Sequence, residues 1–112
     1  MSSTKTGHDA EEFVTNYLKS NGYMVLANNW RTRYCEIDIV ATKAKVVYFV
    51  EVKYRHSDSW GDGLDAITPK KLSQMNFAAE MWIANNNWQG QASLAVASVA
   101  GNPIKLINFI EI

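Results

Sequence analysis

Hydrophobic and polar positions form their clearest pattern over residues 34–55, where two runs rich in Val, Ile, Tyr and Phe flank a polar break at 42–45. This pattern predicts a β-hairpin with a short loop. Successive side chains of a strand point to opposite faces of the sheet. On the first strand we therefore expect Glu36 and Asp38 to share one face, and the two isoleucines that follow them to share the other.

The second strand of this hairpin is apolar enough, over residues 46–52, to be a central strand covered on both faces. The same alternation places Glu51 and Lys53 on one face, with Val50 and Val52 on the other. Carboxylates and lysines are rarely buried unless they are paired or bind a metal. Glu51 is therefore the position of the strand that most needs a chemical explanation.

Pairing of the two strands could bring Asp38, Glu51 and Lys53 together. Two carboxylates supply the hard oxygen ligands that Mg²⁺ prefers. A lysine beside them could hold an attacking water molecule, whose pKa the metal lowers. The alternative is an edge hairpin with one solvated polar face, and the spacing alone favours neither interpretation.

A helix is expected over residues 9–20, with Asp9 as N-cap, Glu12 in a capping-box position and a stop at Asn21-Gly22. Residues 1–6 are polar and are expected to form a disordered tail. The remaining predicted elements are a strand over 23–27 with a turn or bulge at 28–29, a loop over 56–63, a helix from Thr68-Pro69 to about 85–87, and strands over 92–99 and 104–110.

This order, α-β-β-β-α-β-β, predicts an α/β fold with a mixed central sheet of about five strands flanked by helices. A chain of 112 residues suits a single domain. Its single cysteine excludes an internal disulfide and favours a reducing compartment. No apolar leader or membrane-length apolar run is present, so we expect a cytoplasmic protein.

The net charge of zero counts against strong non-specific binding to nucleic acid. Basic residues nevertheless outnumber acidic ones over residues 31–55. If Asp38 and Glu51 held a cation, this surface would become clearly positive. A solvated hairpin rim with basic ends is the alternative.

Three charged residues of the predicted helices also attract attention. Glu11 faces partly inward, although a glutamate near a helix N-terminus is also explained by the helix dipole. Lys70 and Lys71 lie in a first helical turn, where that dipole disfavours cations, which indicates an anionic partner such as phosphate. Outside the helices, Trp30 is interpreted as a core residue, and His56 is a candidate proton carrier or a merely solvated loop residue.

The spacing of Asp38, twelve further residues and Glu51-Val52-Lys53 resembles the D…E-x-K signature of the PD-(D/E)XK nuclease superfamily. A longer match resembles the YraN family, small bacterial proteins similar to archaeal Holliday-junction resolvases. This match covers about residues 7–109 and comprises Glu11, Tyr17-Leu18, Gly22-Tyr23, Asn29-Trp30-Arg31, Glu36-Ile37-Asp38, Glu51-Val52-Lys53 and Lys71.

The resemblance implies a restriction-endonuclease-like core and a Mg²⁺-dependent endonuclease, with Mn²⁺ as a substitute, that hydrolyses phosphodiester bonds in branched or structured DNA. By similarity, the catalytic residues would be Glu11, Asp38, Glu51 and Lys53, with Asp38, Glu51 and the Val52 carbonyl at the metal. The residues expected to contact nucleic acid are Arg31, Arg33, Arg55, Lys70 and Lys71. Symmetric cutting of two strands further implies a two-fold homodimer, paired through residues 104–110 if they form an edge strand.

The chain departs from the family pattern at three positions. Ser93 and Ala95 stand where the family commonly has an arginine and an aspartate, and Cys35 replaces a glycine. These departures favour an alternative, a catalytically weak or inactive member that binds nucleic acid or a protein partner. A purely structural interaction domain is a third possibility, but it leaves Glu51 and Lys53 unexplained.

Overall fold

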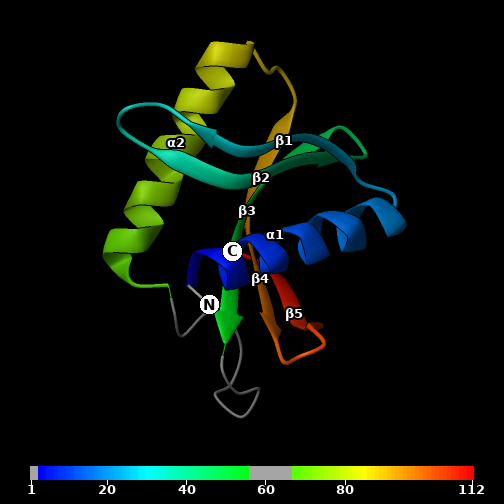
Figure 1. Ribbon diagram of the computed structural model, residues 1–112. Helices are drawn as coiled ribbons and strands as arrows, with labels where there is room; N and C mark the ends of the chain where they lie inside the picture. The colour runs from blue at the N-terminus through cyan, green and yellow to red at the C-terminus, as the bar shows by residue number, and fades with distance from the viewer. Residues whose placement is uncertain (1–2, 56–66) are drawn as a thin grey trace.

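A computed structural model describes residues 3–55 and 67–112, and it has the predicted order of elements (Figure 1). The elements are α1 (Ser3–Ser20), β1 (Met24–Arg31), β2 (Glu36–Lys43), β3 (Val46–Arg55), α2 (Pro69–Asn86), β4 (Gln91–Ala100) and β5 (Lys105–Glu111). No helix in the described part is both long and apolar enough to span a bilayer.

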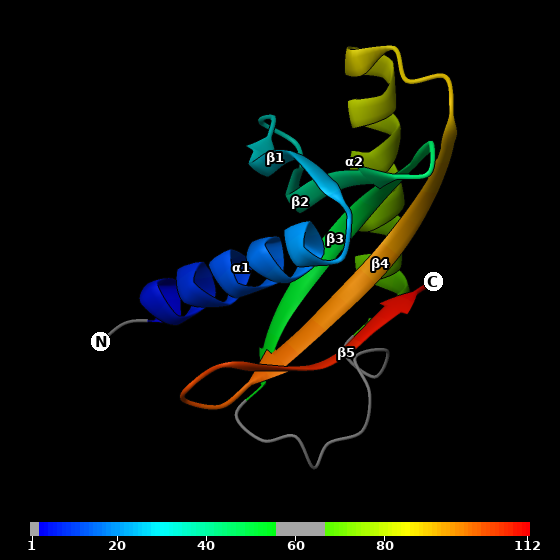
Figure 2. The same cartoon turned by 90° about the vertical axis from the view of Figure 1, so that its right-hand side faces the viewer.

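The five strands form one mixed sheet in the order β1-β2-β3-β4-β5. Strands β3 and β4 are parallel, and the other neighbouring pairs are antiparallel. The helices α1 and α2 pack on opposite faces of this sheet (Figure 2). Strand β3 is therefore central and covered on both sides, as its apolar sequence predicts.

Each face of the sheet has its own hydrophobic core. The α1-side cluster includes Val14 and Leu18 of the helix with Ile39 and Val50 of the strands. The α2-side cluster includes Phe49 and the indole of Trp82, whose ring centroids are 5.6 Å apart. These two cores fix the positions of β2 and β3, which carry the candidate site.

The β2–β3 hairpin turns at Ala44 and Lys45, which have φ angles of 53° and 68°. Two successive residues in the left-handed region are typical of a tight hairpin turn whose twist matches the strands. The turn sets the register, in which Lys43 pairs with Val46. The predicted short loop is confirmed at the last two residues of the polar break at 42–45, whereas the first two residues belong to β2.

Helix α2 begins and ends as predicted. The Thr68 hydroxyl accepts a hydrogen bond from the Lys71 N–H at 3.1 Å, and Pro69 occupies the first turn. At the other end, Asn87 adopts a left-handed conformation and donates its N–H to the Ile83 carbonyl. The cap fixes where Lys71 emerges from the helix.

The structure corrects the predicted start of the first helix and the tail before it. Helix α1 begins at Ser3, so Asp9 lies inside the helix and residues 3–6 do not form a tail. Once α1 packs through buried residues such as Ala10, each extra helical residue adds a hydrogen bond at little cost.

The left-handed φ of 52° at Asn29 marks the irregularity predicted at 28–29, but β1 continues through it, and the register shift lies earlier, between Val25 and Ala27. The Asn28 amide donates to the Thr15 hydroxyl at 2.9 Å. This bond holds the strand against α1 where the sequence indicated a turn.

Candidate functional site

Strands β2 and β3 pair from Lys43 and Val46 as far as Ile39 and Val50. Beyond that point, the Asp38 carboxylate accepts a hydrogen bond from the Val52 backbone N–H at 2.8 Å. The side chain thus takes the place that a backbone acceptor of β2 would have occupied. The Asp38 carboxylate is thereby fixed beside the backbone of β3 at Val52.

The face of β3 that carries the site is the one predicted. Val50 and Val52 lie in or against the α1-side cluster, whereas Glu51 forms an ion pair with Lys53 on its own strand. The distance from Lys53 Nζ to Glu51 Oε2 is 3.5 Å. A second cation approaches the same oxygen from α2, because Lys71 Nζ lies 3.0 Å from it.

The expected alternation on β2 fails at Asp38. Ile37 packs in the α2-side cluster and Ile39 in the α1-side cluster, although strict alternation would put them on one face. The change of face occurs where β2 stops pairing with β3. A strand that is free on one side can rotate its side chains away from the ladder geometry.

The pKa of Asp38 is raised to about 7. Burial is the largest cause, the charge of Glu51 is the second, and the Val52 N–H opposes both. The charges of Glu11 and Glu36 raise this pKa further. Three other carboxylates, one of them on α1, thus act on the charge of Asp38.

The residues at this point fit a small divalent cation. Asp38 and Glu51 offer hard oxygen atoms, and their mutual repulsion would be relieved by positive charge. Within residues 3–55 and 67–112, no three side chains of Asp, Glu, His or Cys gather with metal-ligand spacing. Mg²⁺ suits such a site, because it commonly uses one or two carboxylates and retains several water molecules.

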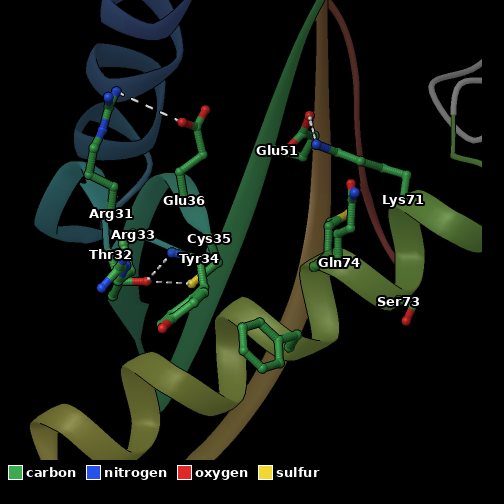
Figure 3. Close-up of a pocket in the computed structure, with 12 residues that line it drawn as sticks. Arg31, Thr32, Arg33, Tyr34, Cys35, Glu36, Glu51, Lys71, Ser73 and Gln74 are labelled. Atoms are coloured by element: carbon green, nitrogen blue, oxygen red, sulfur yellow. Dashed lines mark hydrogen bonds and ion pairs between the residues drawn. The ribbon is translucent and has the colours of Figure 1, made fainter.

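A cavity of about 580 Å³ opens beside Glu51, between α2 and the segment that joins β1 to β2 (Figure 3). Its wall includes four predicted site residues, Glu51, Lys71, Arg31 and Arg33. The other predicted residues do not line it; these are Glu11, Asp38, Val52, Lys53, Arg55 and Lys70. Lys53 instead contacts Glu51 from outside the cavity wall, and the charge of Glu51 acts on Asp38.

One wall of the cavity was not expected from the sequence. It is the tip of the β1–β2 hairpin, closed by the Thr32 N–H, which donates to the Cys35 carbonyl at 2.9 Å. The tip presents Tyr34, which is 70% exposed, and Phe77 of α2, which is 45% exposed, lies in the same cavity. These two rings meet at one cavity only because α2 packs beside the tip of the β1–β2 hairpin. No local sequence signal could predict that the two rings lie together.

Other predicted residues have simpler positions. Trp30 is half-buried against the α2-side cluster, which confirms its interpretation as a core residue. Cys35 is partly buried, with its sulfur 3.4 Å from the Thr32 hydroxyl. His56 and the predicted loop over 56–63 lie outside the described residues.

The departure at Ala95 lies away from Glu51. Ala95 is fully buried in the α1-side cluster, opposite Val50 in the β3–β4 pairing. Glu51 faces the other side of the sheet, toward Lys71 of α2. The alanine therefore removes no carboxylate from the side of the sheet on which the cavity opens.

Comparison with known proteins matches this chain to a single protein family. The model of the uncharacterised protein family UPF0102 matches residues 10–100. A UPF0102 protein of Sulfurihydrogenibium sp. is 40% identical over 105 residues, which cover 93% of this chain and 91% of that protein. UPF0102 proteins of Mycolicibacterium vanbaalenii and Magnetococcus marinus are 39% and 41% identical, over 74% and 73% of this chain and 69% and 67% of their own lengths.

Proposed function

This chain belongs to the UPF0102 family, and we propose that it is a Mg²⁺-dependent nuclease that hydrolyses phosphodiester bonds in DNA, with branched DNA as the preferred substrate. One observation carries the proposal. The Asp38 carboxylate, held on the Val52 N–H, lies within electrostatic reach of Glu51, which itself contacts Lys53. Asp38 of β2 thus meets Glu51 and Lys53 of the central strand β3, where apolar side chains would pack as well.

The partly buried position of Glu51 supports a functional interpretation. Its side chain is only 13% exposed, so its charge has lost much of its hydration. Lys53 and Lys71 compensate this loss. Burying an ion pair seldom stabilises a fold more than well-packed apolar residues would, so the trio is better explained by chemistry than by stability.

The residues have distinct roles in the proposed reaction. Mg²⁺, when bound by Asp38 and Glu51 with the Val52 carbonyl nearby, would supply a Lewis acid that lowers the pKa of a water molecule. Lys53 holds the attacking water and stabilises the negative charge that develops on the phosphate. Glu11 adds negative charge behind Asp38, and Lys71 binds a phosphate oxygen.

A second candidate function has one specific observation in its favour. Lys71 Nζ lies 3.0 Å from Glu51 Oε2, so a side chain of the protein itself neutralises this carboxylate. A site satisfied in this way would suit an inactive relative that binds nucleic acid through the same surface. Binding with no cleavage in either Mg²⁺ or Mn²⁺ would identify this function.

The test is incubation of the purified protein with single-stranded, duplex, flap and four-way DNA in Mg²⁺ or Mn²⁺. We expect wild type to cut at least the branched substrates, and Asp38→Asn to cut none. Glu80→Gln is the matched control, because Glu80 is an exposed carboxylate of α2 outside the cavity wall. If wild type and Asp38→Asn cut equally well, the cleavage does not depend on the proposed metal site and comes from a contaminating nuclease. That outcome would contradict the proposal.

A further inference from the structure

The cavity beside Glu51 combines aromatic and cationic side chains at its open rim. Tyr34 and Phe77 are exposed rings on two different elements, the hairpin tip and α2. Arg31, Arg33 and Lys71 line the same cavity. Exposed aromatic rings beside cations are typical of sites where unpaired bases stack and the backbone is held by charge.

We propose that this cavity binds an unpaired nucleotide of a DNA strand, with its base against Tyr34 and Phe77 and its phosphates near Arg33 and Lys71. The inference rests on the proposed function in one respect: Glu51, in the same wall, would place the reaction beside this nucleotide. The substrate class is then DNA with a single-stranded segment, such as a flap or an opened branch point.

The charge balance favours an unpaired strand over a continuous duplex. The whole chain has no net charge, so tracking along a duplex by phosphate contacts alone would be weak. Within the cavity wall, Glu36 and Glu51 also offset part of the positive charge of the three cations. Stacking must therefore supply much of the affinity, and only unpaired bases offer their faces.

The shape of the site agrees with this occupant. About 580 Å³ lies within the range of pockets that enclose small organic ligands, which suits one base and its sugar. The backbone of Tyr34 is held in the hairpin tip, since the Tyr34 N–H donates to the Thr32 hydroxyl at 3.0 Å. The guanidinium carbon of Arg33 lies over the Tyr34 ring, 5.4 Å from its centre, and Tyr34 is 70% exposed, so a base would stack on the face that Arg33 leaves open.

Direct binding measurements in EDTA test the inference without cleavage. The probes are a fluorescein-labelled 12-mer of thymidylate, an abasic 12-mer with the same phosphates, and a hairpin duplex of equal charge. We expect wild type to prefer the thymidylate strand, and Tyr34→Ala to weaken that binding roughly tenfold and to remove the preference over the abasic strand. Tyr34→Phe should bind as wild type does, because it keeps the stacking surface.

Controls separate stacking from general loss of charge or fold. Leu26→Ala removes an exposed apolar side chain of β1 outside the cavity wall and should change nothing. Arg33→Gln should weaken the binding of all three probes. Lys19→Gln, at an exposed position of α1, should leave their binding unchanged. Circular dichroism should show the same fold for every variant, since all these positions are exposed.

Several outcomes would overturn the inference. They are equal affinity of wild type for the thymidylate and abasic strands, unchanged binding by Tyr34→Ala, and tighter binding of a uridylate RNA 12-mer than of the DNA. If wild type cuts DNA but Tyr34→Ala binds normally, the inference fails and the proposed function stands. If Tyr34-dependent binding occurs without cleavage, the inference stands and the nuclease proposal fails.

Discussion

Lys71 Nζ lies 3.0 Å from Glu51 Oε2, closer than the 3.5 Å that separates Lys53 from the same oxygen. The nearer cation therefore comes from a helix, and the farther one from the same strand as the glutamate. Lys71 occupies the position where positive charge from a bound ion would also act. It would thus compete with a metal for Glu51 until a phosphate offers it another anionic partner.

This competition predicts that Lys71→Ala binds Mn²⁺ more tightly than wild type. A partly exposed ion pair contributes up to about 1 kcal/mol, so the gain should be no more than about fivefold. Calorimetric titration measures it, and Lys70→Ala, one residue away and exposed, is the control. Weaker Mn²⁺ binding by Lys71→Ala would show that Lys71 supports the site rather than competing for it.

The raised pKa of Asp38 predicts that metal binding weakens as the pH falls below about 7. Below that value the carboxyl is protonated and must lose its proton to bind a cation. Mn²⁺ affinity should level off above pH 8 and decrease progressively toward pH 5. An affinity independent of pH over this range would contradict the assignment of Asp38 as a ligand.

The same shift predicts how stability changes with pH in the absence of metal. The folded pKa is about 7, against a reference value of 3.8, so the folded protein binds more protons between these values and loses stability as the pH rises through them. The loss is on the order of 4 kcal/mol at most. Asp38→Asn should abolish it and be more stable than wild type at pH 8.

Urea unfolding in EDTA at pH 5 and pH 8 measures this effect. The asparagine keeps an oxygen that can accept the Val52 N–H, so the local structure should survive. Glu12→Gln, on the exposed face of α1, should leave the pH dependence as it is in wild type. If Asp38→Asn proved less stable than wild type at pH 8, the carboxylate would be contributing to stability instead of opposing it.

Local rules in the sequence predicted the elements and one half of the site. The Thr68-Pro69 cap and the short loop within the polar break at 42–45 depend on residues that are neighbours in the chain, so both were predicted; the cap is confirmed, and the turn lies at 44–45. The faces of Glu51 and Lys53 follow from the two-residue period of a strand. The resemblance to the YraN proteins, which are the UPF0102 family, is confirmed as well.

The rest depended on how distant elements pack. The ion pair between Lys71 and Glu51 exists only because α2 packs with its first turn beside Glu51 of β3. No local sequence pattern specifies this packing. The hairpin tip with Tyr34 joins the cavity for the same reason. The start of α1 was misjudged because Asp9 satisfies the local rule for a cap, yet packing extends the helix beyond it.

The position of β5 suits the predicted homodimer. Strand β5 lies at the edge of the sheet with β4 as its only neighbour among the described strands. Pairing of two such edges across a two-fold axis would satisfy their free backbone groups. We expect Ile107→Lys to weaken the dimer, and Leu26→Lys, on the opposite edge strand, to leave it intact.

Light scattering at high concentration, with and without DNA, measures this association. Lysine on an edge strand disfavours strand pairing between chains, because burying its charge at the interface is costly. Wild type should have twice the monomer mass in at least one of the two conditions. A monomer in both conditions would exclude the β5-paired dimer.

Lys53 distinguishes catalysis from binding. If Lys53 holds the attacking water, Lys53→Ala should lose cleavage while DNA binding survives. Losing one positioned charge beside a developing phosphate charge costs on the order of 3 kcal/mol, or about a hundredfold in rate. One phosphate contact among several contributes far less to affinity.

Asp38→Asn should also abolish cleavage, but for a different reason. It removes a metal ligand, so it should flatten the Mn²⁺ titration, whereas Lys53→Ala should retain it. Cleavage and gel-shift assays on one branched substrate separate the two effects. Lys19→Ala, at an exposed position of α1, is the control for loss of charge. Because the Lys53 side chain is 35% exposed, its removal should leave the fold intact, so cleavage at the wild-type rate would exclude the role assigned to it.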